Sequence, residues 1–443
     1  MASDPQSLNH SAGISGHQHV HQSIIRDPIH GDIFLSPEVR TLIDTRTFQR
    51  LRYISQLATC HFAFPSATHT RFSHSIGAYH LATTLVKRLD EIYPGTMSEL
   101  DQKLVCYGAL LHDIGHPPFS HMLETPEVFA TYASHEEWGK RLLLDEQGDL
   151  YEAMRSLVGI EGINRLIDIM EGRVELPALH DIVSSQLDVD RLDYLVRDQH
   201  FTGVEVGGFD TRRLFRSIRL REDGHLAISR DGLPIVEAYL ITRWHMYYLV
   251  YFHRISVLTQ TYITRALQRA KTLYLKGQLI LSKPLESILI NDALTPNLYM
   301  QLTDAPITAA LFEWSNHEDE QLSTLAKRVS SRSAFHRRIT GYPLKISMAR
   351  RLMPQLRSII SEAGFQPDAD LLLARTQKRG YFPYDGGILL EDGTDVRERS
   401  KIIKALENKI DEVMIFVPHE CVDACVQHID SELIALSNSD SPN

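Results

Sequence analysis

Four histidine and aspartate side chains follow one another in an order that could hold a metal ion. His112 and Asp113 are adjacent inside the apolar run 110–114, His74 lies upstream of them, and Asp190 lies downstream. Imidazole nitrogens and carboxylate oxygens together suit Mn, Fe, Zn or Mg. Histidine and aspartate are seldom buried unless they are paired or bound to a metal. The ordered set therefore predicts a four-ligand cage for a divalent metal ion, with positions left for water or a phosphate oxygen.

Each of these residues taken alone fits a plainer interpretation. A single histidine on an apolar helix is usually a hydrogen-bonded core residue, and Asp188, Asp190 and Asp193 could form a solvated helix face. Only the combination of one histidine, a His-Asp pair and a later aspartate, each on a different predicted helix, favours a metal site.

Longer motifs surround these residues. They occur in the order RDPIHGDI (26–33), FQRLRYISQL (48–57), FPSATHTRFSHSIGAYHLA (64–82), HDIGHPPFSHMLE (112–124), SHEEWG (134–139) and DVDRLDYLVRD (188–198). This series resembles the HD superfamily of metal-dependent phosphohydrolases. Within it, the series is similar to the deoxynucleoside triphosphate triphosphohydrolases of the sterile-alpha-motif and HD-domain branch. The resemblance runs from about residue 24 to about residue 270, and the rest of the chain matches only loosely.

The resemblance implies a role for individual residues. The implied metal ligands are His74, His112, Asp113 and Asp190. The implied active-site residues beside the triphosphate are His116, His121, His135 and Glu124, the last of which stands where the metazoan enzyme has Asp. The implied substrate contacts are Arg71, Gln56, Leu57, Arg191, Tyr194, Asp198, Arg243 and Tyr251. Among these, Gln56 and Leu57 match the positions that read the sugar 3′-OH and crowd its 2′ position.

The implied reaction is hydrolysis of a dNTP to a deoxynucleoside and inorganic triphosphate. Metal-activated water would attack the α-phosphorus, and Arg71 and Arg191 could stabilise charge on the phosphate oxygens. His135 is the expected general acid for the leaving 5′-oxygen, with His116 as the alternative. One departure concerns Tyr247, Tyr248 and Leu249, which stand where the metazoan enzyme has basic residues; fewer charges would then hold the triphosphate.

Two other functions stay open at this point. An HD phosphohydrolase could act on another nucleotide, such as an NTP or an alarmone. Alternatively, a protein without enzymatic activity could bind nucleic acid through two basic segments, 211–221 and 321–361. Nucleic acid is a partner that we do not expect, because the metal set is complete. The resemblance also implies a nucleotide activator at subunit contacts, matched here by Asp44, Gln49, Arg52, Arg213 and Arg230.

The elements that must position these residues are mostly helices. Apolar spacing predicts helices over 37–57, 72–89, 100–112, 152–170, 179–198 and 234–275, with a hairpin over 217–229. We expect a mainly α fold made of three parts: a disordered tail over 1–23, an HD-domain core over 24–275, and a smaller mixed α+β region over 276–443. In that last region, apolar runs at 371–374, 388–390 and 413–417 are separated by a charged helix at about 396–410.

Composition narrows the class of protein further. The chain has 443 residues and a formal net charge of −10, so a general nucleic-acid binder is not expected. Four cysteines in a chain of this length argue against a disulfide framework, and the absence of a CxxC pair argues against a zinc-thiolate site. No apolar run reaches the length of a membrane span, and the N-terminus lacks the pattern of a secretory signal. We expect a cytoplasmic homo-oligomer, a dimer or a tetramer, that does not bind membranes.

Overall fold

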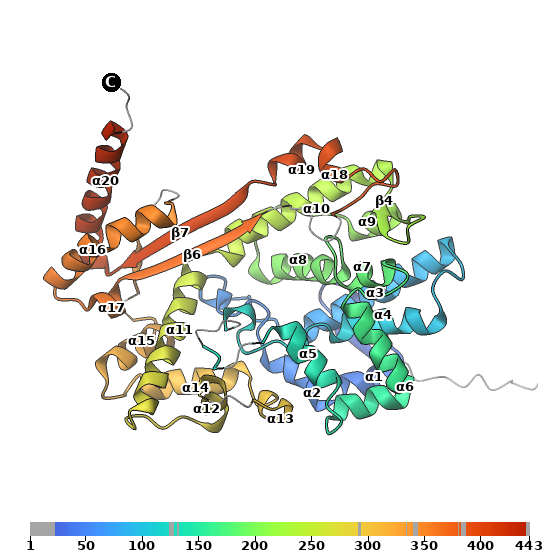
Figure 1. Cartoon of the computed structure of the whole chain (residues 1–443), viewed down its shortest axis with the longest axis horizontal. Helices are drawn as coiled ribbons and strands as arrows, with labels where there is room; N and C mark the ends of the chain where they lie inside the picture. The colour runs from blue at the N-terminus through green and yellow to red at the C-terminus, as the bar shows by residue number, and fades with distance from the viewer. Residues whose placement is uncertain are drawn as a thin grey trace, which may run out of the picture.

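The computed structural model describes residues 23–123, 128–130, 133–290, 294–333, 335–339, 344–379, 381 and 387–439. Helices dominate these residues, and only short sheets accompany them, which confirms the mainly α prediction (Figure 1). Figure 1 shows most helices of residues 37–183 at one end of the molecule and most helices of residues 254–370 at the other, with a long two-stranded ribbon, residues 372–379 and 409–417, running across the top of the view.

The first part of the chain supplies the helices that carry the candidate metal ligands. Its elements are β1 (Ser23–Asp27), β2 (Gly31–Leu35), α1 (Pro37–Ile43), α2 (Arg46–Gln49), α3 (Arg71–Ile92), α4 (Glu99–Leu111), α5 (His135–Leu143), α6 (Asp149–Met170), α7 (Ala178–Val183) and α8 (Val189–Thr202). Serine or aspartate side chains cap several of these helices: Ser98 accepts from Asp101 N, Ser134 from Glu137 N and Asp188 from Arg191 N. Each cap satisfies a backbone N–H that the first helical turn leaves free.

The second part continues with helices and ends in a small sheet. Its elements are α9 (Thr211–Ser217), β3 (Ile218–Leu220), β4 (Leu226–Ile228), α10 (Leu233–Met246), α11 (Arg254–Leu275), α12 (Lys283–Leu289), α13 (Pro296–Tyr299), α14 (Asp304–Trp314), α15 (Glu320–Ser330), β5 (Arg337–Arg338), α16 (Ile346–Glu362), α17 (Pro367–Asp370), β6 (Leu372–Arg379), α18 (Val396–Arg399), α19 (Lys401–Ala405), β7 (Lys409–Val417) and α20 (Val422–Ser439). Strand β7 lies between β5 and β6, and both neighbours run antiparallel to it.

Three of the predicted helices are each broken in two or more pieces. The segment 37–57 forms α1, α2 and a 3-10 turn at Arg50–Tyr53, and 179–198 divides into α7 and α8 around a turn at 184–188. The predicted helix 234–275 passes through a π-helical turn at Tyr247–Tyr251 before α11 begins. Sequence periodicity missed these breaks because apolar spacing continues across them. All three breaks supply residues that line the cavity described below: the Tyr247–Tyr251 turn, Ser184 and the residues after the 3-10 turn.

One large hydrophobic core extends from β2 to β7. It contains Ile33 near its start and Phe416 near its end, and it includes Leu285, Ile307 and Leu322 from the segment that follows α11. The core therefore has no boundary at residue 275, and the division into units over 24–275 and 276–443 stays a prediction. A second, smaller cluster of buried residues lies entirely within 339–429.

Neither membrane-spanning helices nor disulfides were found. Within the described ranges, no helix is both long enough and apolar enough to cross a bilayer. All four cysteines are free.

Candidate metal centre and nucleotide cavity

A cavity of about 660 Å³ opens over the end of α4 and the start of α8. Its size falls in the usual range of pockets that hold small-molecule ligands and cofactors. Twelve of the residues predicted to act on or bind substrate, or to hold the metal, are among those that line it: Gln56, Leu57, Arg71, His112, Asp113, His116, His135, Asp190, Arg191, Tyr194, Asp198 and Tyr251.

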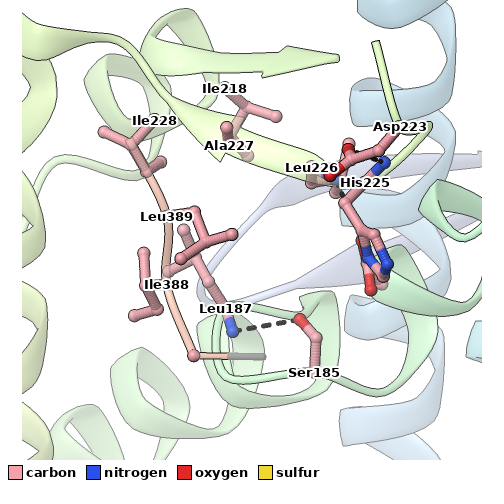
Figure 2. Close-up of a pocket in the computed structure, with 12 residues that line it drawn as sticks. Ser185, Leu187, Ile218, Asp223, His225, Leu226, Ala227, Ile228, Ile388 and Leu389 are labelled. Carbon is pink, nitrogen blue, oxygen red and sulfur yellow. Dashed lines mark hydrogen bonds and ion pairs between the residues drawn. The ribbon is translucent and has the colours of Figure 1, made fainter. Parts of the chain in front are cut away.

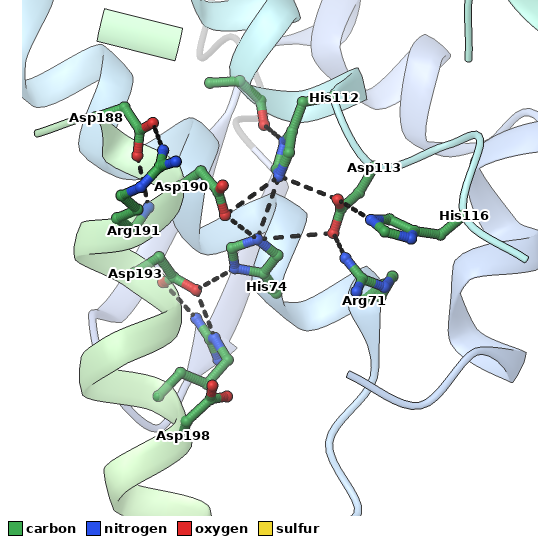
Figure 3. Close-up of polar contacts among 12 residues, drawn as sticks. Arg71, His74, His112, Asp113, His116, Asp188, Asp190, Arg191, Asp193 and Asp198 are labelled. Atoms are coloured by element: carbon green, nitrogen blue, oxygen red, sulfur yellow. Dashed lines mark hydrogen bonds and ion pairs between the residues drawn. The ribbon is translucent and has the colours of Figure 1, made fainter. Parts of the chain in front are cut away.

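Three donor atoms converge at the floor of this cavity (Figure 3). The Nε2 atom of His74 lies 3.0 Å from Asp190 Oδ1 and 3.2 Å from His112 Nε2, and His112 Nε2 lies 3.6 Å from Asp190 Oδ1. Metal bonds of ~2.1 Å separate two ligand atoms by about 3.0 Å at a right angle and about 3.4 Å at the tetrahedral angle. The His-His-Asp donor set therefore fits one divalent ion.

Asp113 lies beside this triad and also contacts two residues outside it, His116 and Arg71. Its Oδ1 is 3.3 Å from His112 Nε2 and 3.1 Å from His116 Nε2, and its Oδ2 is 3.7 Å from His74 Nε2. Arg71 Nη1 donates to the same Oδ2 at 2.5 Å. Asp113 is thus near enough to join the triad as a fourth ligand while it is held in place by Arg71.

Outer hydrogen bonds orient both histidines of the triad. His74 Nδ1 lies 2.8 Å from Asp193 Oδ2, and His112 Nδ1 lies 2.8 Å from the carbonyl oxygen of Ala109. These contacts direct each Nε2 toward the cluster, the arrangement that metal-bound histidines adopt. Asp193 also accepts from Arg197 Nε at 2.8 Å and lies 2.6 Å from His30 Nε2.

Asp193 belongs to a buried charge network that reaches the N-terminal hairpin. Arg197 Nη1 donates to Asp27 at 2.8 Å, and Asp193 and Arg197 are both fully buried. Helix α3 approaches this network so closely that a Cβ at Gly77 would lie 2.0 Å from Asp193 Oδ1. Gly77 therefore permits the contact between α3 and α8 that brings His74 to Asp190.

The charges of the cluster shift the ionisation of its members. Burial lowers the pKa of His74, but hydrogen bonds with Asp190 and Asp193 outweigh burial and raise that pKa to about 10. Burial raises the pKa of Asp190, but hydrogen bonds with His112 and His74 bring it well below its usual value. Without a metal ion, a proton thus occupies part of the site, and a bound cation must displace it.

His116 and His135 stack face to face above the cluster. Their ring centroids are 4.0 Å apart and their planes are inclined by 11°. Burial, Arg71 and His135 together hold the pKa of His116 well below its usual value. Gly115 permits the approach of helix α5, because a Cβ there would lie 2.0 Å from the carbonyl oxygen of His135.

A second hydrogen-bonded group also lines the cavity. Asp198 Oδ1 is 2.7 Å from His69 Nε2, and its Oδ2 accepts from the Tyr251 hydroxyl at 2.7 Å. Asp198 is 1% exposed, so Tyr251 is the part of this group that reaches farther into the cavity. Nearby, the buried Oε1 of Gln56 accepts no hydrogen bond from any described residue.

The segment that follows α11 stabilises the wall of the cavity through hydrogen bonds. Asp304, the first residue of α14, accepts from Ser55 N at 2.9 Å and from Phe119 N at 2.7 Å. Phe119, Ser120 and Ala58 line the cavity with positive φ angles of 53°, 54° and 48°. Such angles are strained for residues with a side chain and are kept only where the surroundings enforce them.

Arg50 and Tyr299 hold the turn that carries Asp113 and His116. Arg50 donates to the carbonyl oxygens of His116 at 2.8 Å, Ile114 at 3.2 Å and Leu302 at 2.9 Å. The Tyr299 hydroxyl donates to the Gly115 carbonyl at 2.5 Å. Residues beyond 275 therefore help to shape the site, a role that was not predicted for them.

Some predicted residues lie elsewhere or outside the described part of the chain. Arg243 is 2% exposed, is not among the described residues that line the cavity, and donates to Gln186 Oε1 at 3.2 Å. Glu124 and the side chain of His121 fall outside the described residues. Four residues of the predicted activator set, Asp44, Arg52, Arg213 and Arg230, are exposed. The fifth, Gln49, is half-buried.

Acidic residues that lie outside the two basic segments pair with many of their arginines. Arg328 pairs with Asp370, Arg338 with Glu412, Arg351 with Glu432 and Arg357 with Asp368. In the first segment, Arg221 lies 2.9 Å from Asp223 and Arg219 lies 3.5 Å from Glu391. The pairing weakens the case for a nucleic-acid surface, because a basic face needs unpaired charge.

Several residues around the site were not singled out as functional. They are Asp27, His30, Arg50, His69, Asp193, Arg197, Tyr299, Asp304 and Lys378. Six of them lie in the quoted motifs, so a signal for these six was present: Asp27 and His30 in 26–33, Arg50 in 48–57, His69 in 64–82, and Asp193 and Arg197 in 188–198. No local pattern marks Asp304 or Lys378, because both reach the site only through the fold.

A smaller cavity of about 270 Å³ lies between β4 and residues 387–389 (Figure 2). Its polar groups are already satisfied: Asp181 accepts from Leu226 N at 2.9 Å and pairs with His225 Nδ1 at 3.0 Å. Leu187, Ile218, Ile388 and Leu389 supply apolar walls. We assign this cavity no ligand.

Comparisons with known proteins agree with the geometry. The HD domain model matches residues 71–198, and the HD associated region model matches residues 209–275. The uncharacterized protein YwfO of Bacillus subtilis is 30% identical over 403 residues, which cover 88% of this chain and 90% of YwfO. A solved phosphohydrolase from Bacteroides thetaiotaomicron is 30% identical, with a TM-score of 0.77 over 90% of this chain and 100% of that one.

The deoxynucleoside triphosphate triphosphohydrolase SAMHD1 is also similar. The human protein is 34% identical over 279 residues, which cover 56% of this chain and 44% of SAMHD1; the chicken protein is 31% identical over 315 residues, covering 63% and 51%. The chain thus spans about half the length of these relatives. It belongs to the HD-domain phosphohydrolase family and is related within it to the SAMHD1 deoxynucleoside triphosphate triphosphohydrolases.

Proposed function

We propose that the protein is a metal-dependent dNTP triphosphohydrolase that releases a deoxynucleoside and inorganic triphosphate. One observation supports the proposal most directly. A single cavity lies over the His-His-Asp metal triad and is also lined by Gln56, Leu57 and the hydrogen-bonded pair Asp198 and Tyr251. A nucleotide needs one end of its site for phosphate and another for sugar and base. Both kinds of group line this cavity.

The phosphate end uses the metal ligands and their neighbours. His74, His112 and Asp190, with Asp113 beside them, would hold a divalent ion such as Mn, Mg, Fe or Zn. When bound, the ion supplies a Lewis acid and lowers the pKa of water. Arg71 lines the cavity and stabilises negative charge on phosphate oxygens, although it shares its guanidinium with Asp113.

His135 is our general acid for the leaving 5′-oxygen. It lines the cavity, is half-buried and lies outside the triad. His116 is the weaker alternative, because its depressed pKa leaves it without a proton to give near neutral pH. The stacking of the two rings also opposes simultaneous protonation of both, since like charges 4.0 Å apart repel.

The sugar end supports a preference for deoxyribose. Gln56 presents a buried carbonyl oxygen without a described partner, and a 3′-hydroxyl could donate to it. Leu57 lines the cavity beside it, where an aliphatic side chain disfavours a polar 2′-hydroxyl. We therefore expect dNTPs to be turned over faster than NTPs.

The proposal is tested by incubation with a panel of dNTPs, NTPs and an alarmone, followed by chromatography of the products. Deoxynucleoside and triphosphate from dNTPs would support it. Turnover of NTPs or alarmones with dNTPs left intact would favour the second candidate, another nucleotide phosphohydrolase, which the shared phosphate chemistry allows. Leu57→Ala should raise kcat/KM for ATP relative to dATP, whereas Leu100→Ala, at an exposed position outside the cavity, should not.

We further propose that the protein acts as a homo-oligomer, a dimer or a tetramer, and that nucleotides bind at its subunit contacts. The exposure of Asp44, Arg52, Arg213 and Arg230 supports this assignment, because their polar groups are accessible to a ligand. Gln49 and Arg52 already form one unit, since Arg52 Nε donates to Gln49 Oε1 at 2.7 Å. Sedimentation with and without dGTP, on the protein and on Arg52→Ala, tests the proposal.

A further inference from the structure

Lys378 reaches the nucleotide cavity from strand β6, far along the chain from the other residues that line it. It is among the cavity-lining residues, and its Nζ lies 5.1 Å from the centroid of the Tyr247 ring. Strand β6 belongs to the two-stranded β6–β7 ribbon, which runs across the top of the view in Figure 1. The ribbon thus brings a positive charge to a site otherwise built from residues before position 261.

Aromatic rings connect the metal centre to Lys378 along one wall of the cavity. The His74 and Tyr194 ring centroids are 6.3 Å apart, those of Tyr194 and Tyr251 are 6.4 Å apart, and those of Tyr251 and Tyr247 are 5.1 Å apart. Lys378 lies over the last of these rings. The wall therefore runs from the metal ligands to the lysine without interruption.

Lys378 differs from the two arginines among the described residues that line the cavity in having no described carboxylate partner. Arg71 is paired with Asp113 and Arg191 with Asp188. The neighbouring acid on the ribbon, Asp411, is bound by Arg375 and Gln377. Among the described residues that line the cavity, Lys378 therefore brings a cation that no carboxylate neutralises.

Electrostatic effects on Tyr247 show that Lys378 lies close to Arg191 and Arg243. Burial raises the pKa of Tyr247, but Arg243, Lys378 and Arg191 together outweigh burial and lower it. Three cations close to one phenol create a region of positive potential beyond the metal triad. A polyphosphate is the ligand that such a region attracts.

We propose that Lys378 binds the phosphates that lie beyond the one held at the metal centre. The inference rests on the proposed function. Tyr247, Tyr248 and Leu249 stand where the related metazoan enzyme has basic residues, and Lys378 would supply a positive charge in their place. A flexible, exposed lysine can extend from the ribbon toward an anion that enters the cavity. Lys378 acts in this view as a point charge on the triphosphate and takes no part in bond breaking.

The test compares Lys378→Ala with Lys409→Ala. Lys409 is the matched control, because it lies on the paired strand β7 opposite Arg379 and its Nζ donates to Gln377 at 2.8 Å. Calorimetry with tripolyphosphate and with dAMP measures binding without turnover. We expect Lys378→Ala to weaken tripolyphosphate binding about ten-fold or more, with dAMP binding unchanged, and Lys409→Ala to change neither.

Steady-state kinetics with dATP give an independent measurement. Lys378→Ala should raise KM with kcat nearly unchanged, as expected for an interaction present equally in the ground and transition states. Lys378→Arg should restore most of the affinity. Equal tripolyphosphate binding by Lys378→Ala and the unmodified protein would overturn the inference, as would an equal loss in Lys409→Ala.

The calorimetry separates this inference from the proposed function. If the protein does not hydrolyse dNTPs but Lys378→Ala still loses tripolyphosphate binding, the function is wrong and the lysine assignment stands. If dNTPs are hydrolysed and tripolyphosphate binding does not depend on Lys378, the function stands and the lysine assignment fails.

Discussion

The Nδ1 atom of His74 lies 2.8 Å from a carboxylate oxygen of Asp193, and both side chains are fully buried. This contact directs His74 Nε2 toward Asp190 and His112. The metal triad therefore depends on an aspartate that is not one of its members. Asp193 is in turn held by Arg197, which extends the support to Asp27 and the N-terminal hairpin.

Asp193→Asn should weaken metal binding by about 10- to 100-fold, the usual effect of losing an outer-shell partner of a metal-bound histidine. Asp27→Asn is the matched control, because Asp27 also pairs with Arg197 but does not contact His74. We expect both variants to lose thermal stability and only Asp193→Asn to lose the metal. Thermal unfolding measures the stability of each variant, and elemental analysis measures its metal content. Equal metal loss in both variants would contradict the prediction.

Metal affinity should increase with pH, because the ion competes with a proton on His74. The folded-state pKa of about 10 lies above the ordinary value of 6.5, so at neutral pH the metal-free site holds a proton that binding must release. The same shift stabilises the metal-free protein below about pH 6.5, and that stability is lost as pH rises through about 10. Calorimetry in buffers of different ionisation enthalpy measures the released protons. A titration in which no proton is released would count against this prediction.

His135→Ala should keep its metal and bind dNTP but lose kcat by ~10²-fold or more, the usual scale for a positioned general acid. A substrate with a better leaving group, such as a p-nitrophenyl ester, should recover much of the loss. Glu137→Gln is a suitable control, since Glu137 lies on the same helix, is exposed, pairs with Arg141 and is not among the described residues that line the cavity. Turnover of dNTPs by His135→Ala at the parent rate would move the acid role to another residue.

Asp304→Asn should reduce activity although Asp304 is not among the residues that line the cavity. Its two oxygens accept from Ser55 N and Phe119 N, and an asparagine amide group can replace only one of these acceptors. The loss of one buried hydrogen bond costs about 1–3 kcal/mol. We expect a lower unfolding temperature together with a lower kcat/KM for dNTP. Asp319→Asn, an acidic cap of a different helix remote from the cavity lining, should lower stability alone.

Much of the local structure could be predicted from the sequence. The helices around 72–89 and 100–112 match α3 and α4 closely, since long apolar spacing and caps specify them. The breaks at 184–188 and 247–251 could not be predicted, because apolar periodicity continues through both. Those breaks are set by tertiary contacts, and the second of them turns Tyr247 and Tyr251 toward the cavity.

By itself, the sequence determined the order of His74, His112, Asp113 and Asp190, the mainly α class and the membership of the HD family. The first two follow from residue types and local spacing, and the third follows from the resemblance of the longer motifs to that family. The tertiary structure decided which distant groups complete the site. Asp304 and Lys378 lie on segments that carry no motif, and Arg243 does not line the cavity although its sequence match suggests that it should. The physical reason is that burial, charge pairing and loop support depend on which segments the fold brings together, and local pattern does not encode those contacts.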